Sequence, residues 1–224
     1  MRMRRKKNLQ TRLADCADYL KIPAMPDDRD FRCAAEQTAF IDLDGWFDKK
    51  QPLWLEIGCG RGQFAAELAK AHPEVNILAV EKVANVIVSA AEKAKEQALP
   101  NLRCLGCAAE YLPRYLHPHR AERLYLNFSC PFPKARYAAH RLTSERFLPI
   151  YAALLTEKAE IHQKTDNRAF FEYSIEKLTA FGYALKNVSL DLHHSDFEGN
   201  IVTEYEKRFS DLGQPIYRLE AYRR

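Results

Sequence analysis

Short apolar runs alternate with longer amphipathic stretches along most of this chain. The short runs predict strands at 53–57, 75–80, 102–107, 124–128, 159–164, 184–192 and 215–222, whereas apolar residues spaced three and four apart predict helices at 63–71, 84–98, 144–155 and 169–181. Strands that alternate with helices are joined by right-handed crossovers, which give parallel pairing. The pattern therefore predicts an α/β fold, with a doubly wound, mostly parallel, seven-stranded sheet.

Composition supports a folded chain with a distinct amino-terminal part. The chain has 224 residues, of which 47% are hydrophobic and 29% charged, which excludes a disordered or fibrous protein. Charges interrupt every apolar stretch well before the roughly 20 residues that cross a bilayer. We expect residues 1–50 to form a helical, partly flexible lead-in and residues 51–224 to form one domain.

Basic residues are concentrated at the amino terminus. The net charge is +4, but residues 1–13 contain six basic side chains and no acid, which leaves the rest of the chain at −2. Such an arm is typical of contacts with a phosphate backbone, and it is equally typical of a solubilising tail. No apolar segment follows it, so we do not expect a signal peptide.

The six cysteines do not form the pattern of a disulfide framework, and the cytosol is the expected compartment. Cys104 and Cys107 form a C-x-x-C pair, but no second ligand pair has zinc-site spacing. The histidines also lack metal-type helical spacing. We therefore expect no metal site.

A glycine-rich loop after the first strand of the predicted domain indicates a nucleoside-binding site. Gly58, Gly60 and Gly62 stand just before a helix, where a ligand can approach the backbone closely. Glu56 would repel the pyrophosphate of a dinucleotide, and Glu81 ends the next strand, where an acid accepts hydrogen bonds from ribose hydroxyls. A cationic adenosine compound, S-adenosylmethionine, fits both carboxylates; the alternative is a structural turn beside a surface glutamate.

The loops after the third and fourth of these strands carry the next candidates. Methyltransferases that use S-adenosylmethionine commonly have an acid or a small polar residue near the adenine, after the third strand. Ala108 occupies that place here, and Glu110 is the nearest carboxylate. In the sequence NFSCPFPKAR, Phe132 offers a stacking face and Lys134 and Arg136 offer positive charge. This loop is either a platform for a base and its phosphates or a solvated basic turn.

Several motifs in order resemble one family. They are NFSCPFPKAR (127–136), KTDNRAFFEYS (164–174), DLH (191–193), EGNIVTEYE (198–206) and PIYR (215–218). Together they resemble the bacterial tRNA (guanine-N(7)-)-methyltransferases, over residues 53–222. The resemblance implies a Rossmann-like class I fold, S-adenosylmethionine as cofactor, tRNA as partner, and methyl transfer in the cytoplasm to nitrogen 7 of a guanosine in the variable loop.

The resemblance also implies roles for individual residues. Some of these positions also have a structural explanation. Asn167 is a candidate helix cap, and Thr203 and Glu206 together are a candidate capping box. The implied contacts are with the cofactor at Glu56, Gly58, Gly60, Glu81, Ala108 and Cys130, and with the guanosine or its tRNA at Lys134, Asp166, Thr203, Glu204, Tyr205 and Glu206.

One position departs from the family pattern. Cys130 stands where the family has an aspartate that is regarded as catalytic. Guanine nitrogen 7 has an in-plane lone pair, so no base is needed, and alignment of the reacting atoms can supply most of the acceleration. We expect an active enzyme in which Glu110 or Asp166 covers part of the lost role. The alternatives are a relative that binds S-adenosylmethionine or tRNA without catalysis, and a small-molecule methyltransferase.

Overall fold

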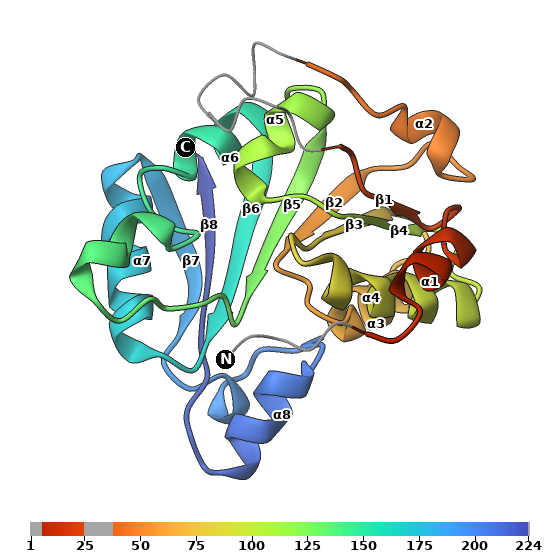
Figure 1. Ribbon diagram of the computed structural model, residues 1–224. Helices are drawn as coiled ribbons and strands as arrows, with labels where there is room; N and C mark the ends of the chain where they lie inside the picture. The colour runs from red at the N-terminus through yellow and green to blue at the C-terminus, as the bar shows by residue number, and fades with distance from the viewer. Residues whose placement is uncertain (1–5, 25–37, 224) are drawn as a thin grey trace. The chain divides into compact units, whose positions relative to one another are not determined.

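The computed structural model describes residues 6–24 and 38–223. The chain folds into two compact units, Met1–Tyr115 and Leu116–Arg224, and each combines helices with four strands (Figure 1). Arg2, Arg4, Arg5 and Cys33 lie outside the described residues. Among the described residues, no helix is long and apolar enough to cross a membrane.

The first unit is built on parallel strands. β1 (Leu20–Lys21), β4 (Leu102–Leu105), β3 (Asn76–Val80) and β2 (Leu53–Ile57) lie side by side in this order, and each neighbouring pair is parallel. Every residue of β2, β3 and β4 is buried. Burial on both faces is characteristic of parallel sheets, and it explains why these strands are continuous apolar runs.

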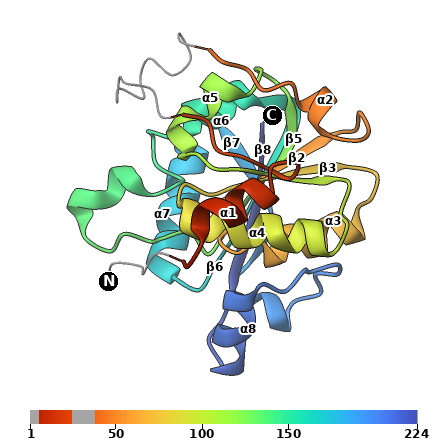
Figure 2. The same cartoon turned by 45° about the vertical axis from the view of Figure 1, so that its right-hand side comes forward.

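The helices of the first unit pack on these strands and on one another. α3 (Gln63–Ala71) and α4 (Ala84–Glu96) contact each other and the strands β3 and β4 (Figure 1). The remaining helical elements are α1 (Leu9–Asp15), α2 (Leu43–Trp46), η2 (Ala109–Tyr111) and α5 (Leu112–Tyr115). α1 lies alongside α4 (Figure 2).

Side chains in the described part of the lead-in bond to other elements of the first unit. The Arg12 guanidinium makes two hydrogen bonds of 2.6 Å with Glu92 of α4, and the Lys6 amide donates to Asn85 Oδ1. The buried Arg103 side chain donates to the carbonyl of Trp46 at 2.9 Å. These bonds fix the lead-in on the first unit, so the described part of the basic arm is partly engaged within the protein.

The second unit mixes parallel and antiparallel strands. β5 (Ala121–Asn127) pairs in parallel with β6 (Leu155–Thr165), and β8 (Tyr217–Arg223) runs antiparallel between β6 and β7 (Tyr183–Ser189). The helical elements are η3 (Ala135–His140), α6 (Leu148–Leu154), α7 (Arg168–Ala180), η4 (Leu192–His194) and α8 (Glu204–Asp211). α8 lies beyond the carboxyl end of β6 (Figures 1 and 2).

The mostly parallel α/β fold predicted from the hydrophobic pattern is confirmed, with one difference in the number of strands. The described residues form eight strands where seven were predicted, because β1 adds a parallel strand beside β4. β1 is two residues long and too short to produce a periodic pattern. β6 is also longer than predicted, since its first half contains the polar stretch 156–158.

Candidate functional site

The loops of the first unit that follow β2, β3 and β4 begin at the same level of the sheet. Ile57 pairs with Val80, and Val80 pairs with Leu105, so the three strands end together. The amides of Gly58 and Cys59 both donate to the carbonyl of Val80, at 2.8 and 3.1 Å. This register brings the glycine loop, Glu81 and the Ala108 loop to one edge, where parallel sheets bind ligands.

The glycines of this loop have two different roles. All three have left-handed backbones, with φ of 81° at Gly58, 57° at Gly60 and 72° at Gly62. A Cβ at Gly58 or Gly60 would have no atom within 4 Å, whereas at Gly62 it would lie 2.4 Å from the Cβ of Ala90. Gly62 therefore allows close packing on α4, and Gly58 and Gly60 leave open space that a ligand can fill.

Two carboxylates flank the open glycines. Glu56 is buried, with 3% of its surface exposed, and Glu81 is half-buried. Glu81 Oε1 accepts the Val83 amide at 3.0 Å. Burial, together with the carboxylates of Glu56 and Glu81, raises the pKa of the Cys59 thiol well above its usual value. The two carboxylates thus place negative charge beside the open glycines, which fits the sulfonium and ribose of S-adenosylmethionine better than a phosphate group.

The third loop is shaped by β1 and the short helix that follows β4. The Gly106 amide donates to the Lys21 carbonyl at 2.8 Å, and a Cβ at Gly106 would lie 2.7 Å from Ile22 Cγ1. Ala108 has an extended backbone and directly precedes η2, which contains Glu110. Burial raises the pKa of Cys107 to about 12, so this thiol stays protonated near neutral pH.

The loop at the end of β5, NFSCPFPKAR (127–136), here called the proline loop, is held in an unusual backbone conformation. Phe128 and Phe132 are both left-handed, with φ of 49° and 41°, which costs roughly 1–2 kcal/mol for a residue with a side chain. Arg141 donates to the carbonyls of Pro131 at 2.9 Å and Phe132 at 3.1 Å. Arg141 therefore stabilises this loop, a role that differs from the basic surface its sequence position suggests.

The predicted substrate side of the proline loop faces solvent. Cys130 and Lys134 are exposed, and the Arg136 guanidinium lies 4.8 Å from the centroid of the Tyr137 ring. The hydroxyl of Ser129 is buried and has no hydrogen-bond partner among the residues that the structure describes. The loop thus presents positive charge and an aromatic ring at the end of β5.

Asp166 directly follows β6, as predicted from the sequence, and is half-buried. The Asn167 amide donates to Thr165 Oγ1 at 3.1 Å, and Asn167 Oδ1 accepts the Phe170 amide at 2.8 Å. The predicted cap of α7 is confirmed. These bonds fix the backbone on the carboxyl side of Asp166.

The predicted capping box at the start of α8 is also confirmed. The Glu206 amide donates to Thr203 Oγ1 at 2.9 Å, and the Thr203 amide donates to Glu206 Oε2 at 3.3 Å. Glu206 is completely buried and lies 2.6 Å from Lys164 Nζ, whereas Tyr205 is 60% exposed. Of these predicted substrate contacts, Tyr205 is accessible and the Glu206 carboxylate is enclosed; the Glu204 side chain lies outside the described part.

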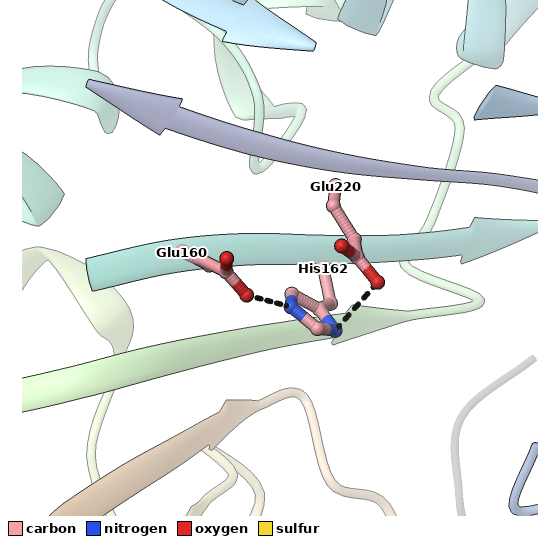
Figure 3. A group of neighbouring side chains, drawn as sticks. All are labelled: Glu160, His162 and Glu220. Carbon is pink, nitrogen blue, oxygen red and sulfur yellow. Dashed lines mark hydrogen bonds and ion pairs between the residues drawn. The ribbon is translucent and has the colours of Figure 1, made fainter. Parts of the chain in front are cut away.

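A group of titratable side chains on β6 and β8 has the composition of a metal site (Figure 3). Glu160 Oε2 lies 2.9 Å from His162 Nε2, and Glu220 Oε1 lies 3.9 Å from His162 Nδ1. Lys186 donates to Glu160, and Arg218 donates to Glu220. These protein cations already compensate both carboxylates, so the group is better explained as an ion-pair network than as a metal site.

The residues predicted to contact the cofactor from the first unit, which are Glu56, Gly58, Gly60, Glu81 and Ala108, thus share one edge of its sheet. In the second unit, Asp166 directly follows β6, and Glu206, at the start of α8, bonds to Lys164 near the carboxyl end of the same strand. Sequence reasoning missed Lys164, Phe128 and the structural role of Arg141. The sequence feature that could have indicated a role for Lys164 is its position, as a charged residue at the end of a predicted buried strand.

Comparisons with known proteins agree on a family. A family model described as "Putative methyltransferase" matches residues 50–219. A tRNA (guanine-N(7)-)-methyltransferase of Macrococcus caseolyticus is 51% identical over 208 residues, which cover 90% of this chain and 99% of the relative. The protein with the same name from a Geobacillus species is 49% identical over 78% of this chain and 79% of its own length.

Solved structures show the same fold at low sequence identity. A mutant of the 16S rRNA (adenine(1408)-N(1))-methyltransferase from Catenulisporales acidiphilia, with cosubstrate SAM, aligns with a TM-score of 0.55 and 16% identity over 89% of this chain and 92% of its own. A precorrin-6y C5,15-methyltransferase from Geobacter metallireducens has a TM-score of 0.55 and 14% identity, with 87% of each chain covered. These likenesses confirm a Rossmann-like class I methyltransferase fold.

Proposed function

The chain belongs to the tRNA (guanine-N(7)-)-methyltransferase family, and from this premise we propose that it transfers a methyl group from S-adenosylmethionine to nitrogen 7 of a guanosine in the variable loop of tRNA. The observation that carries the proposal is the glycine loop, where open space at Gly58 and Gly60 lies beside the carboxylates of Glu56 and Glu81. A cationic nucleoside needs both features.

The first unit would hold the cofactor. Glu81 Oε1 accepts the Val83 amide, and the carboxylate is half-buried near the open glycines, so it suits a ribose hydroxyl. Glu56 would place negative charge near a sulfonium or amino group, and Ala108 would leave room for the adenine ring. When bound, S-adenosylmethionine supplies a methyl group that is activated by its positive sulfur.

The second unit would hold the guanosine and its phosphates. Lys134 is exposed at the end of the proline loop and would contact a phosphate, while Asp166 would accept hydrogen bonds from the guanine edge. Because nitrogen 7 already has a lone pair, these residues need to hold and orient the base and do not need to remove a proton. Orientation of this kind can supply about 7–11 kcal/mol of a barrier.

Cys130 supports a second candidate function. It is exposed at the position where the family has an aspartate, so a carboxylate is missing there, and a thiol gives only weak hydrogen bonds. A weakened enzyme, or a protein that binds S-adenosylmethionine or tRNA without turnover, is therefore the alternative. If this alternative holds, the Cys130→Asp variant should transfer methyl groups to tRNA much faster than the wild type. The active enzyme that we favour transfers them without this replacement.

The proposal extends to the organisation of the chain and its place in the cell. We assign residues 1–50 as a lead-in with a basic arm and residues 51–224 as the methyltransferase domain. Transfer RNA is modified where it is made, so we place the protein in the cytoplasm.

The test is transfer of radiolabelled methyl groups from S-adenosylmethionine to an unmodified tRNA transcript. The proposal predicts saturable incorporation of about one methyl group per tRNA, and a transcript with adenosine in place of the target guanosine is the matched control. Absence of incorporation at high enzyme concentration, while calorimetry detects S-adenosylmethionine binding, would favour the non-catalytic alternative.

A further inference from the structure

We propose that Lys164 is a positioning residue for the guanosine-binding part of the second unit, because its buried ammonium group fixes α8 and the loop before it at the end of β6. The inference rests on the proposed function, since it concerns the motif Thr203–Glu206 that the family resemblance assigns to the substrate. It assigns to Lys164 a role that neither its sequence position nor its charge alone indicates.

α8 has few apolar contacts: the rings of Tyr205 and Phe209 stack on that of Phe128, with centroids 6.3 and 6.4 Å apart. It is eight residues long, and helices of this length are marginal without tertiary contacts. Among its described side chains, Glu206 alone is buried; Tyr205 is exposed, and Phe209 is half-buried. Besides the ring contacts of Tyr205 and Phe209, the position of α8 depends on what holds its single enclosed carboxylate.

Lys164 holds that carboxylate with the full hydrogen-bonding capacity of its ammonium group. Lys164 Nζ donates to Glu206 Oε2 at 2.6 Å, to the carbonyl of Ile201 at 2.8 Å and to Asn200 Oδ1 at 3.0 Å. An ammonium group has three donors, and these three bonds use them all. Lys164 thus has no donor left for a substrate, and its effect on substrate must pass through the residues that it holds.

Glu206 is occupied in the same way. Its Oε2 accepts from Lys164 and from the Thr203 amide, and its Oε1 accepts from Asn200 Nδ2 and lies 3.3 Å from His193 Nε2. A carboxylate with both oxygens engaged and no exposed surface positions its neighbours and does not contact a nucleoside. The network joins β6, η4, the loop before α8 and the first turn of α8.

The residues that this network positions are accessible and suited to a base. Tyr205 is exposed, and its ring plane is within 19° of that of Phe128, with the centroids 6.3 Å apart. The Phe128 amide donates to the carbonyl of Lys164 at 2.8 Å. Lys164 therefore binds the proline loop through its backbone carbonyl and α8 through its side chain. Loss of the Lys164 side chain should displace Tyr205 relative to Asp166.

The experiment compares Lys164→Met with the double variant Lys164→Met/Glu206→Met. Lys158→Met, on an exposed lysine of the same strand, is the control.

The single variant leaves a buried carboxylate without its cation and should lose stability. The double variant removes both charges, so we expect a Tm close to that of the wild type. In both variants we expect KM for tRNA to rise at least about tenfold, because small displacements of positioning groups are costly. The affinity for S-adenosylmethionine and the control should be unchanged.

A purely structural ion pair predicts a different result. The double variant would then have the wild-type Tm together with the wild-type KM and kcat, and this outcome would overturn the proposal. Hydrogen exchange of the α8 amides gives a readout that does not depend on activity: we expect faster exchange in both variants and no change in Lys158→Met. If the wild type itself does not methylate tRNA, the proposed function fails, whereas unchanged α8 exchange in the double variant is a failure of this inference alone.

Discussion

Replacement of the loop glycines one at a time separates packing from cofactor binding. Gly58→Ala and Gly62→Ala each put a side chain on a left-handed backbone, which costs roughly 1–2 kcal/mol. The new methyl group at Gly62 would also lie 2.4 Å from Ala90 Cβ and 2.8 Å from its Cα. Overpacking of this kind adds about 1–3 kcal/mol. The expected loss is therefore about 2–5 kcal/mol for Gly62→Ala and about half of that for Gly58→Ala.

Thermal denaturation and calorimetric titration with S-adenosylmethionine measure the two effects separately. At about 2–4 °C per kcal/mol for a chain of this size, Gly62→Ala should lower Tm by roughly 4–20 °C and Gly58→Ala by roughly 2–8 °C. Gly58→Ala should nevertheless weaken cofactor binding more, because its methyl group fills space that is open in the structure. Equal Tm values for the two variants, or an unchanged cofactor affinity in Gly58→Ala, would refute this account of the loop.

Three further predictions test other parts of the protein. Glu81→Ala should raise the Kd for S-adenosylmethionine at least about tenfold in calorimetry, because hydrogen bonds to a charged group contribute roughly 1.5–3 kcal/mol, and tRNA affinity should hardly change. Lys134→Ala should weaken tRNA binding and reduce the slope of log Kd against log salt by about one phosphate contact, with cofactor affinity unchanged. Burial lowers the pKa of His162 to about 4 from 6.5, so between these pH values the unfolded chain takes up a proton that the folded chain does not. Stability should therefore fall as the pH drops from 6.5 to 4, and His162→Gln should lose less Tm over this interval than the wild type or the exposed control His140→Gln.

The regular core of this fold could be predicted from the sequence because its periodicity is strong. β2 and α3 have the predicted bounds, since the strand is a continuous apolar run and the helix follows a glycine turn. β1 could not be predicted, because a two-residue strand depends on its pairing partner β4 and has no pattern of its own. The short helix α8 could be predicted only through its capping box.

The candidate site was predictable where one residue type has one chemical use. Glu56 and Glu81 could be proposed from the sequence because carboxylates at strand ends beside glycines suit few ligands, and the structure places both at one edge of the strands of the first unit. The enclosed position of Glu206 could not be predicted, because it depends on Lys164, which is 42 positions away in the chain. Arg141 likewise reads as a surface charge in the sequence, and only the folded loop shows that it binds two backbone carbonyls.

We infer that this chain methylates nitrogen 7 of guanosine in tRNA with Cys130 at the position where the family resemblance implies an aspartate. The most direct test of this inference is nucleoside analysis by mass spectrometry of a tRNA transcript incubated with wild-type protein and S-adenosylmethionine. We predict about one 7-methylguanosine per tRNA and none when the target guanosine is replaced. The inference would be contradicted if the tRNA stayed intact but contained no 7-methylguanosine after incubation with the wild type, whereas incubation with Cys130→Asp produced it. The wild-type chain would then be a non-catalytic relative.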